Sequence, residues 1–186
     1  RQNRIAGRTG SVLLYATLAV HTAWLVISHI QLGYLPFVDA SHALSFVAWG
    51  IAVAYATIEL RLGRSGFGAF VTPIAFVSQT VAAVFLFRQP QPGQLTEILR
   101  SLWFEIHIAS ALFSYCSFAV AFAAGLMYIL LCSELRLKKL GFFFKRMPPL
   151  DVLGTMNYHA VALGFLFLTI GIGSGIVWSI EAGRSG

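Results

Sequence analysis

Charged side chains are scarce in this chain. Asp, Glu, Lys and Arg make up 11% of its 186 residues, whereas hydrophobic residues make up 58%. A water-soluble domain carries roughly a quarter charged residues, so this composition supplies too little polar surface for one. Five apolar stretches are instead long enough to cross a bilayer as helices, which takes about 20 residues each. The composition predicts an all-α, polytopic transmembrane bundle, a single domain over 1–186 with spans at about 10–32, 42–60, 68–87, 103–132 and 156–180.

Cysteine is nearly absent, with only Cys116 and Cys132 in the sequence. The two lie on one predicted helix, about 24 Å apart at 1.5 Å per residue, so they cannot form a disulfide with each other. There is no Cys-x-x-Cys motif, which argues against thiol redox chemistry, and no Cys-x-x-Cys-His motif for covalent attachment of c-type haem. Both cysteines are predicted to be packing residues.

Motifs of hydrolases and nucleotide-binding proteins are also missing. The sequence contains no His-Glu-x-x-His motif, no P-loop and no paired carboxylates within a predicted span. Asp39 and Asp151 fall on opposite sides of the predicted membrane, so a Ser-His-Asp triad cannot be assembled. The run "GIGSG" lies inside an apolar span, where Gly171 and Gly175 are predicted to let another helix approach closely. A hydrolase or a proton pump is therefore poorly supported.

The few basic residues are unevenly distributed. Three of the thirteen, Arg88, Arg100 and Arg184, fall on one predicted side. The other ten fall on the opposite side: Arg1, Arg4, Arg8, Arg61, Arg64, Arg136, Lys138, Lys139, Lys145 and Arg146. The positive-inside rule then places the N-terminus in the cytoplasm and the C-terminus outside. The net charge of +6 is predicted to meet anionic lipid rather than nucleic acid.

A second type of helix is predicted between the third and fourth spans. After the loop "RQPQPGQ", apolar residues recur at steps of three and four, at Leu95, Ile98, Leu99, Leu102, Trp103 and Ile106. This is the helical period, and charges occupy the opposite face. We therefore predict a helix over about 95–106 that lies on the outer membrane surface. It would lead the chain to His107 at the mouth of the fourth span.

Histidines are the main chemical signal, because ionisable groups within membrane spans are costly and usually functional. His21 falls near the middle of its span and His159 near the inner end, whereas His29, His42 and His107 fall near outer ends. Three imidazoles at one depth could supply axial haem ligands or a metal site. Alternatively, each caps a helix or bonds a backbone carbonyl at the membrane boundary. His21 and His29 lie about 80° off a common helix face, so they pair poorly as ligands of one b-type haem.

Three segments of the sequence resemble the CcsA/ResC/HemX cytochrome c assembly family. "LPFVDASHALSFVAW" is similar to the family's early outer-loop motif, with His42 in place of the usual Glu. "LWFEIHIASALFSY" is similar to its Trp-x-x-x-His segment, and "LGFLFLTIGIGSGIVWSIEAG" to its Gly-Phe-x-x-Leu-Thr-x-Gly-x-x-x-Gly-x-x-Trp-x-x-Glu-Ala signature. Together they cover most of residues 32–183 in the family's order. In the family, the Glu-Ala leads into a tryptophan-rich external segment on which haem lies, and this sequence stops before it.

The resemblance implies a haem-handling protein of cytochrome c maturation, the N-terminal five-helix portion of a CcsA/ResC-like or HemX-like chain. It implies haem b as the cofactor, with His107 as an axial ligand and His42 and His29 as weaker candidates. The implied partners are membrane lipid, a ResB/CcsB-like membrane protein and apocytochrome c, to which the family's complexes attach haem. The implied location is a bacterial inner membrane or a thylakoid-type membrane. The alternative is a non-catalytic structural or accessory subunit of a larger membrane complex.

Overall fold

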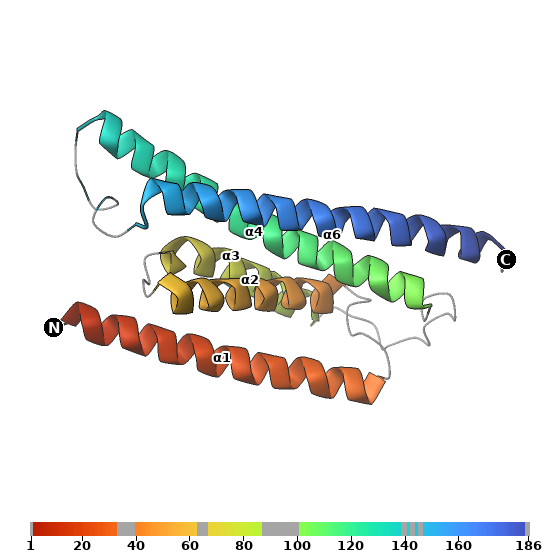
Figure 1. Ribbon diagram of the computed structural model, residues 1–186. Coiled ribbons are helices and arrows are strands. Elements are labelled where there is room, and N and C mark those ends of the chain that lie inside the picture. The colour runs from red at the N-terminus through yellow and green to blue at the C-terminus, as the bar shows by residue number, and fades with distance from the viewer. Residues whose placement is uncertain are drawn as a thin grey trace.

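The computed structural model describes residues 2–32, 40–62, 67–86, 101–138, 141, 144 and 147–184. Its main elements are five α-helices, α1 (Gln2–Leu32), α2 (Ala40–Leu62), α3 (Gly68–Leu86), α4 (Leu102–Arg136) and α6 (Leu150–Arg184), and these described residues contain no strand. Successive helices run in opposite directions, so the two termini lie at opposite ends of the bundle (Figure 1). The prediction of an all-α protein built on five hydrophobic helices is confirmed.

Four of these helices are long and apolar enough to cross a membrane. Their candidate spans are Arg8–Gln31, Ala40–Arg61, Leu102–Arg136 and Leu150–Arg184. The third predicted span, 68–87, corresponds to a shorter apolar helical segment, Gly68–Val84. Pro73 lies inside α3 and removes one of its backbone hydrogen bonds. The inside–outside orientation stays a prediction, because the helix lengths and directions are the same for either orientation.

Helices α4 and α6 form the most extensive helix pair of the described chain. Glycines make the close approach possible: a Cβ at Gly164 would lie 2.5 Å from Cε1 of Phe118, and one at Gly171 would lie 3.6 Å from Cβ of Ser110. The Asn157 side-chain amide donates a 2.7 Å hydrogen bond to the carbonyl oxygen of Ala121 on the facing helix. Small residues and a polar contact of this kind stabilise helix pairs in lipid. There, apolar side chains gain little from exchanging contacts with lipid for contacts with another helix.

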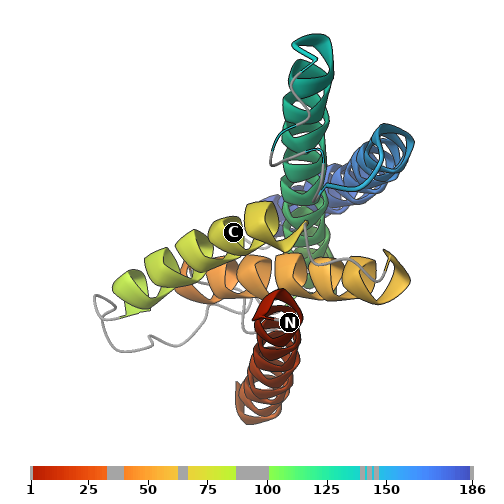
Figure 2. The ribbon, with the colours of Figure 1, turned by 90° about the vertical axis from the view of Figure 1, so that its left-hand side faces the viewer.

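Helix α2 lies at the centre and contacts α1, α3 and α4. Its residues Ile51 and Tyr55 join Phe67, Met127 and Leu153 in the main cluster of buried side chains. Helix α1 lies at the edge of the bundle (Figures 1 and 2). Of the α1 side chains that the structure describes, Leu25 alone is buried. The side chains are therefore closely packed around α2, α4 and α6, whereas α1 is loosely packed against the rest of the bundle.

The predicted surface helix is corrected in its second half. Residues 95–100 lie outside the described residues, but Leu102–Ile106 form the first turns of α4 itself. Ser101 is the N-cap of that helix, and its side chain accepts a 3.2 Å hydrogen bond from the backbone N–H of Phe104. Leu102, one of the apolar residues that defined the predicted surface helix, is 67% exposed. The serine cap starts the spanning helix at Leu102, one residue from the predicted start of the fourth span at 103, so Leu102–Ile106 belong to that helix and not to a separate surface helix.

Candidate functional site

The end of the α4–α6 pair that the positive-inside rule predicts to be external holds the histidine that the sequence favoured most. His107 lies in the second turn of α4, partly buried, with Nδ1 2.7 Å from the carbonyl oxygen of Gly171 on α6. A carbonyl oxygen can only accept, so Nδ1 carries the proton and donates it. The tautomer is thereby fixed, and Nε2 keeps its lone pair. Among the described residues, no donor is bound to that nitrogen.

Gly175 makes room for this imidazole. A Cβ at Gly175 would lie 2.7 Å from Nδ1 and 2.9 Å from Cε1 of His107. A Cβ at Gly171 would lie 3.7 Å from the His107 carbonyl oxygen. The single hydroxyl proton of Ser174 is shared between the carbonyl oxygens of Ile170 at 2.8 Å and Gly171 at 3.0 Å. Of the predicted pair, Gly175 has the close contact, with the ring of His107, whereas a Cβ at Gly171 would make only ordinary van der Waals contacts.

Aromatic side chains surround the same outer end. Phe104, one turn before His107, packs on Trp178 of α6 with ring centroids 5.0 Å apart. Trp103 on the neighbouring face is 38% exposed. An imidazole with a bare Nε2 beside exposed aromatic rings has the chemistry of an axial haem ligand, whose second nitrogen is held by a carbonyl. The residues at this end of the bundle therefore fit a haem group.

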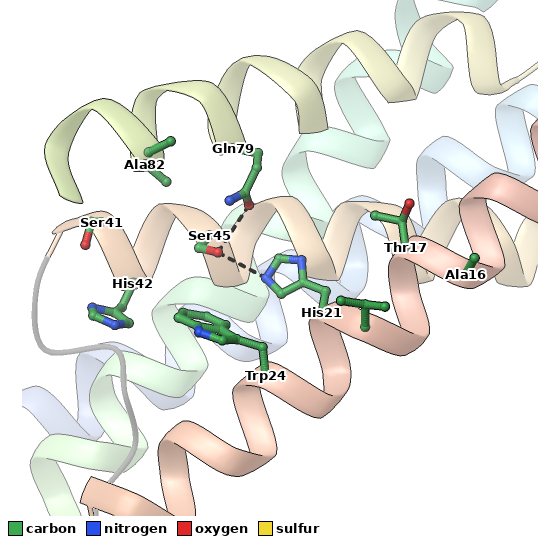
Figure 3. A pocket seen from close by; sticks show the side chains of 11 residues that line it. Ala16, Thr17, His21, Trp24, Ser41, His42, Ser45, Gln79 and Ala82 are labelled. Atoms are coloured by element: carbon green, nitrogen blue, oxygen red, sulfur yellow. Dashed lines mark hydrogen bonds between the residues drawn. The ribbon is translucent and has the colours of Figure 1, made fainter. Parts of the chain in front are cut away.

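A second polar site lies between α1, α2 and α3, where a cavity of about 660 Å³ is formed (Figure 3). Six of its eleven lining residues are polar or ionisable, namely Thr17, His21, Ser41, His42, Ser45 and Gln79. The indole of Trp24 stacks on the imidazole of His42, with centroids 5.5 Å apart and planes inclined by 6°. Nε2 of His21 lies 3.0 Å from the hydroxyl oxygen of Ser45, which in turn donates a 3.1 Å hydrogen bond to Oε1 of Gln79.

The three predicted haem-ligand candidates have separate surroundings. His107 contacts α6, His42 stacks on Trp24 of α1, and His29 is exposed near the end of α1. Within the described parts of the chain, no group of three or more His, Cys, Asp or Glu side chains could hold a metal ion. His159, placed by the sequence near the inner end, is exposed on α6 beside the ring of Tyr158. Among the three ligand candidates, His107 is thus the one whose ring is held by a backbone carbonyl of another helix.

Sequence reasoning missed the site around His21. The sequence placed His21 near the middle of a span but did not identify its partners. Ser45 lies 24 residues after His21, and Gln79 lies 34 residues after Ser45. The available signal was a set of hydrogen-bonding residues within three apolar stretches. Only the arrangement of α1, α2 and α3 shows that these residues face one another.

Comparison with known proteins gives a consistent result over most of the chain. A family profile described as "Cytochrome C assembly protein" matches residues 37–183. The cytochrome c biogenesis protein CcsA of Guillardia theta is 26% identical over 192 residues, covering 95% of this chain and 62% of that protein. Protein HemX of Bacillus subtilis (strain 168) is 27% identical over 179 residues, covering 96% of this chain and 64% of that protein. The CcsA of Thermosynechococcus vestitus is 27% identical, with 95% and 66% covered.

The chain therefore spans about three fifths to two thirds of the length of these curated relatives. No solved structure matches it significantly.

Proposed function

Because this chain belongs to the cytochrome c assembly protein family, we propose that it handles haem in cytochrome c maturation and presents it at the outer face of the membrane. His107 is the ligand that this chain contributes at the α4–α6 end. The observation that carries the proposal is the hydrogen bond from Nδ1 of His107 to the Gly171 carbonyl. That bond orients the ring and leaves the Nε2 lone pair for iron, which is how carbonyl partners prepare histidine ligands.

The residues around His107 have separate roles in this proposal. Gly175 leaves the space in which the imidazole lies, and the carbonyl oxygen of Gly171 accepts its Nδ1–H. Phe104 and Trp178 provide flat apolar surface beside the ring. Haem supplies the vinyl groups to which the cysteines of an apocytochrome add. His42 and His29 are the weaker ligand candidates on this chain.

The remaining parts of the proposal follow from the family and from the printed names of the relatives. Haem b is the form proposed, and a ResB/CcsB-like membrane protein and apocytochrome c are the proposed partners. The membrane is a bacterial inner membrane or a thylakoid-type membrane; relatives named as cytochrome c biogenesis proteins occur in Guillardia theta and in Thermosynechococcus vestitus.

The test is the absorption spectrum of the full-length gene product purified from haem-replete cells. We expect low-spin haem bands in the wild type and their shift or loss in His107→Ala, because the axial nitrogen is removed. His159→Ala is the matched control, since His159 is exposed on the inner half of α6, and its spectrum should be nearly unchanged. Equal spectra for wild type and His107→Ala would contradict the ligand assignment. Absence of haem from all three proteins would favour a non-catalytic accessory subunit.

A further inference from the structure

The cavity between α1, α2 and α3 is formed by the loosely packed side of the bundle. Its lining residues all come from these three helices, and among the described residues α4 and α6 contribute none. Figure 2 shows α1 on the side of α2 that faces away from α4 and α6, with α3 running alongside α2. Two of the lining side chains, Val20 and Trp24, are 73% and 39% exposed. In a membrane, this cavity opens sideways into the hydrocarbon core, so its ligand would arrive from the bilayer.

Hydrogen bonds fix the position of the proton on His21. The hydroxyl of Ser45 donates to Oε1 of Gln79, so the Ser45 oxygen is free to accept from Nε2–H of His21 (Figure 3). Nδ1 is then the bare nitrogen. Within the described residues, no donor is bound to it. His21 therefore offers an acceptor, while the Gln79 amide group, whose oxygen is occupied, offers N–H donors.

The charge of the lining restricts the ligand. No Asp, Glu, Lys or Arg is present among the described residues that line the cavity. A carboxylate placed there would be desolvated without a counter-charge, which is costly in a membrane. This disfavours porphyrin propionates and fatty acids. It favours a neutral molecule with a ring hydroxyl or ring carbonyl.

The shape and lining of the cavity suit a flat ring. Trp24 and His42 stack face to face and form one wall, and the rings of His21 and Trp24 lie 5.9 Å apart. A volume of about 660 Å³ lies within the roughly 300–1,000 Å³ of small-molecule sites. The cavity runs from Thr17, in the middle of the α1 span, to Ser41 at the start of α2. It has room for a ring and the first part of an apolar tail.

We propose that this cavity binds the head group of an isoprenoid quinone or quinol taken from the bilayer. A quinol O–H would donate to Nδ1 of His21, and a quinone carbonyl would accept from the Gln79 amide. Both redox forms therefore find a partner on residues that are already positioned. This proposal concerns a site separate from His107 and does not depend on haem binding there.

The test is a titration of the full-length protein in lipid nanodiscs with decyl-benzoquinone, followed by quenching of tryptophan fluorescence. We expect saturable quenching that is largely lost in Trp24→Phe, because Trp24 forms the cavity wall. In a parallel titration with the reduced form, decyl-benzoquinol, His21→Leu should raise the half-saturating concentration about tenfold, the effect of losing one hydrogen bond in an apolar site. Gln79→Leu should weaken binding of the quinone form in the same direction.

Two controls separate this site from its surroundings. Thr80→Val changes the neighbouring residue of α3, whose hydroxyl bonds Phe76 of its own helix, and should titrate like wild type. His107→Ala should also titrate like wild type, so failure of the haem proposal would leave this one unaffected. If His21→Leu does not accumulate, His21→Gln and Gln79→Leu give the same comparison. Quenching that rises without saturation, equally in wild type and in the His21 and Gln79 variants, would overturn the proposal and indicate acyl chains only.

Discussion

At the scale of single residues, the position of the His107 ring depends on the absence of a side chain at Gly175. The glycine lets the imidazole lie against the backbone of α6 and donate to the Gly171 carbonyl. A histidine at the end of a membrane helix could form its hydrogen bonds with water or lipid headgroups. Here a backbone carbonyl of another helix holds it, so the direction of Nε2 is set by the helix pair.

Gly175→Ala should therefore displace the ring. The added methyl would lie 2.7 Å from Nδ1, and overpacking of this kind costs about 1–3 kcal/mol. We expect a lower fraction of low-spin haem and a lower thermal unfolding temperature in detergent. Gly173→Ala is the matched control, because a Cβ there meets nothing within 4 Å, and should change stability by less than about 1 kcal/mol. Indistinguishable spectra and unfolding temperatures for the two variants would show that Gly175 does not position His107.

At the scale of elements, the α4–α6 pair is the rigid part of the molecule and α1 is its loose edge. The pair is joined by glycine contacts at Gly164, Gly171 and Gly175 and by the Asn157 amide, which donates to Ala121. Helix α1 is attached through fewer contacts, including the bond from Trp49 Nε1 to the Thr22 hydroxyl at 2.9 Å and the contact of Leu25 with α2 and α4 residues. This difference places the haem-ligand candidate on rigid helices and the lateral cavity beside a loosely packed one.

Asn157→Ala should loosen the α4–α6 pair without altering its apolar surface much. The lost interhelical hydrogen bond is worth about 0.6–2 kcal/mol in a membrane. Tyr158→Ala, at a neighbouring side chain that is 70% exposed, should have a smaller effect on the pair. The measurement is unfolding of the purified protein in mixed detergent micelles, with both variants compared with wild type. An equal midpoint for Asn157→Ala and wild type would mean that the hydrogen bond contributes nothing measurable.

At the scale of the whole molecule, alternating helix directions gather the basic residues at one end. Arg8, Arg61, Arg136 and Lys138 lie at the end where α1 begins and α2 and α4 finish, and Arg184 lies at the opposite end (Figure 1). The same opposite end carries His107 and Trp178. The positive-inside rule therefore predicts that the histidine lies at the external face.

Cysteine labelling can test this orientation on one helix. In a background with Cys116 and Cys132 replaced by alanine, Leu102→Cys should react with an impermeant maleimide added outside intact cells. Lys138→Cys, at the other end of α4, should react only after the membrane is permeabilised. Both parent side chains are exposed, so access to the reagent depends on the side of the membrane. The reverse pattern would overturn the N-in, C-out topology and the external position of His107.

Helix number, approximate helix limits and the depth of each histidine were determined by the sequence itself. Hydropathy over about 20 residues is a local property, and a spanning helix satisfies all its backbone groups internally. The predicted surface helix over 95–106 was wrong in its second half, because Ser101 caps α4 and Leu102–Ile106 belong to that helix.

Only the tertiary structure decided which face of each helix meets a neighbouring helix. In a membrane, helices can be apolar on every side, so hydrophobic spacing does not reveal which face meets a neighbour. The hydrogen bond from His107 to Gly171 spans 64 residues, and the chain from His21 through Ser45 to Gln79 joins three helices. Such contacts depend on the rotation of each helix about its axis. That rotation is set by glycine contacts and interhelical hydrogen bonds, which exist only once the helices have packed.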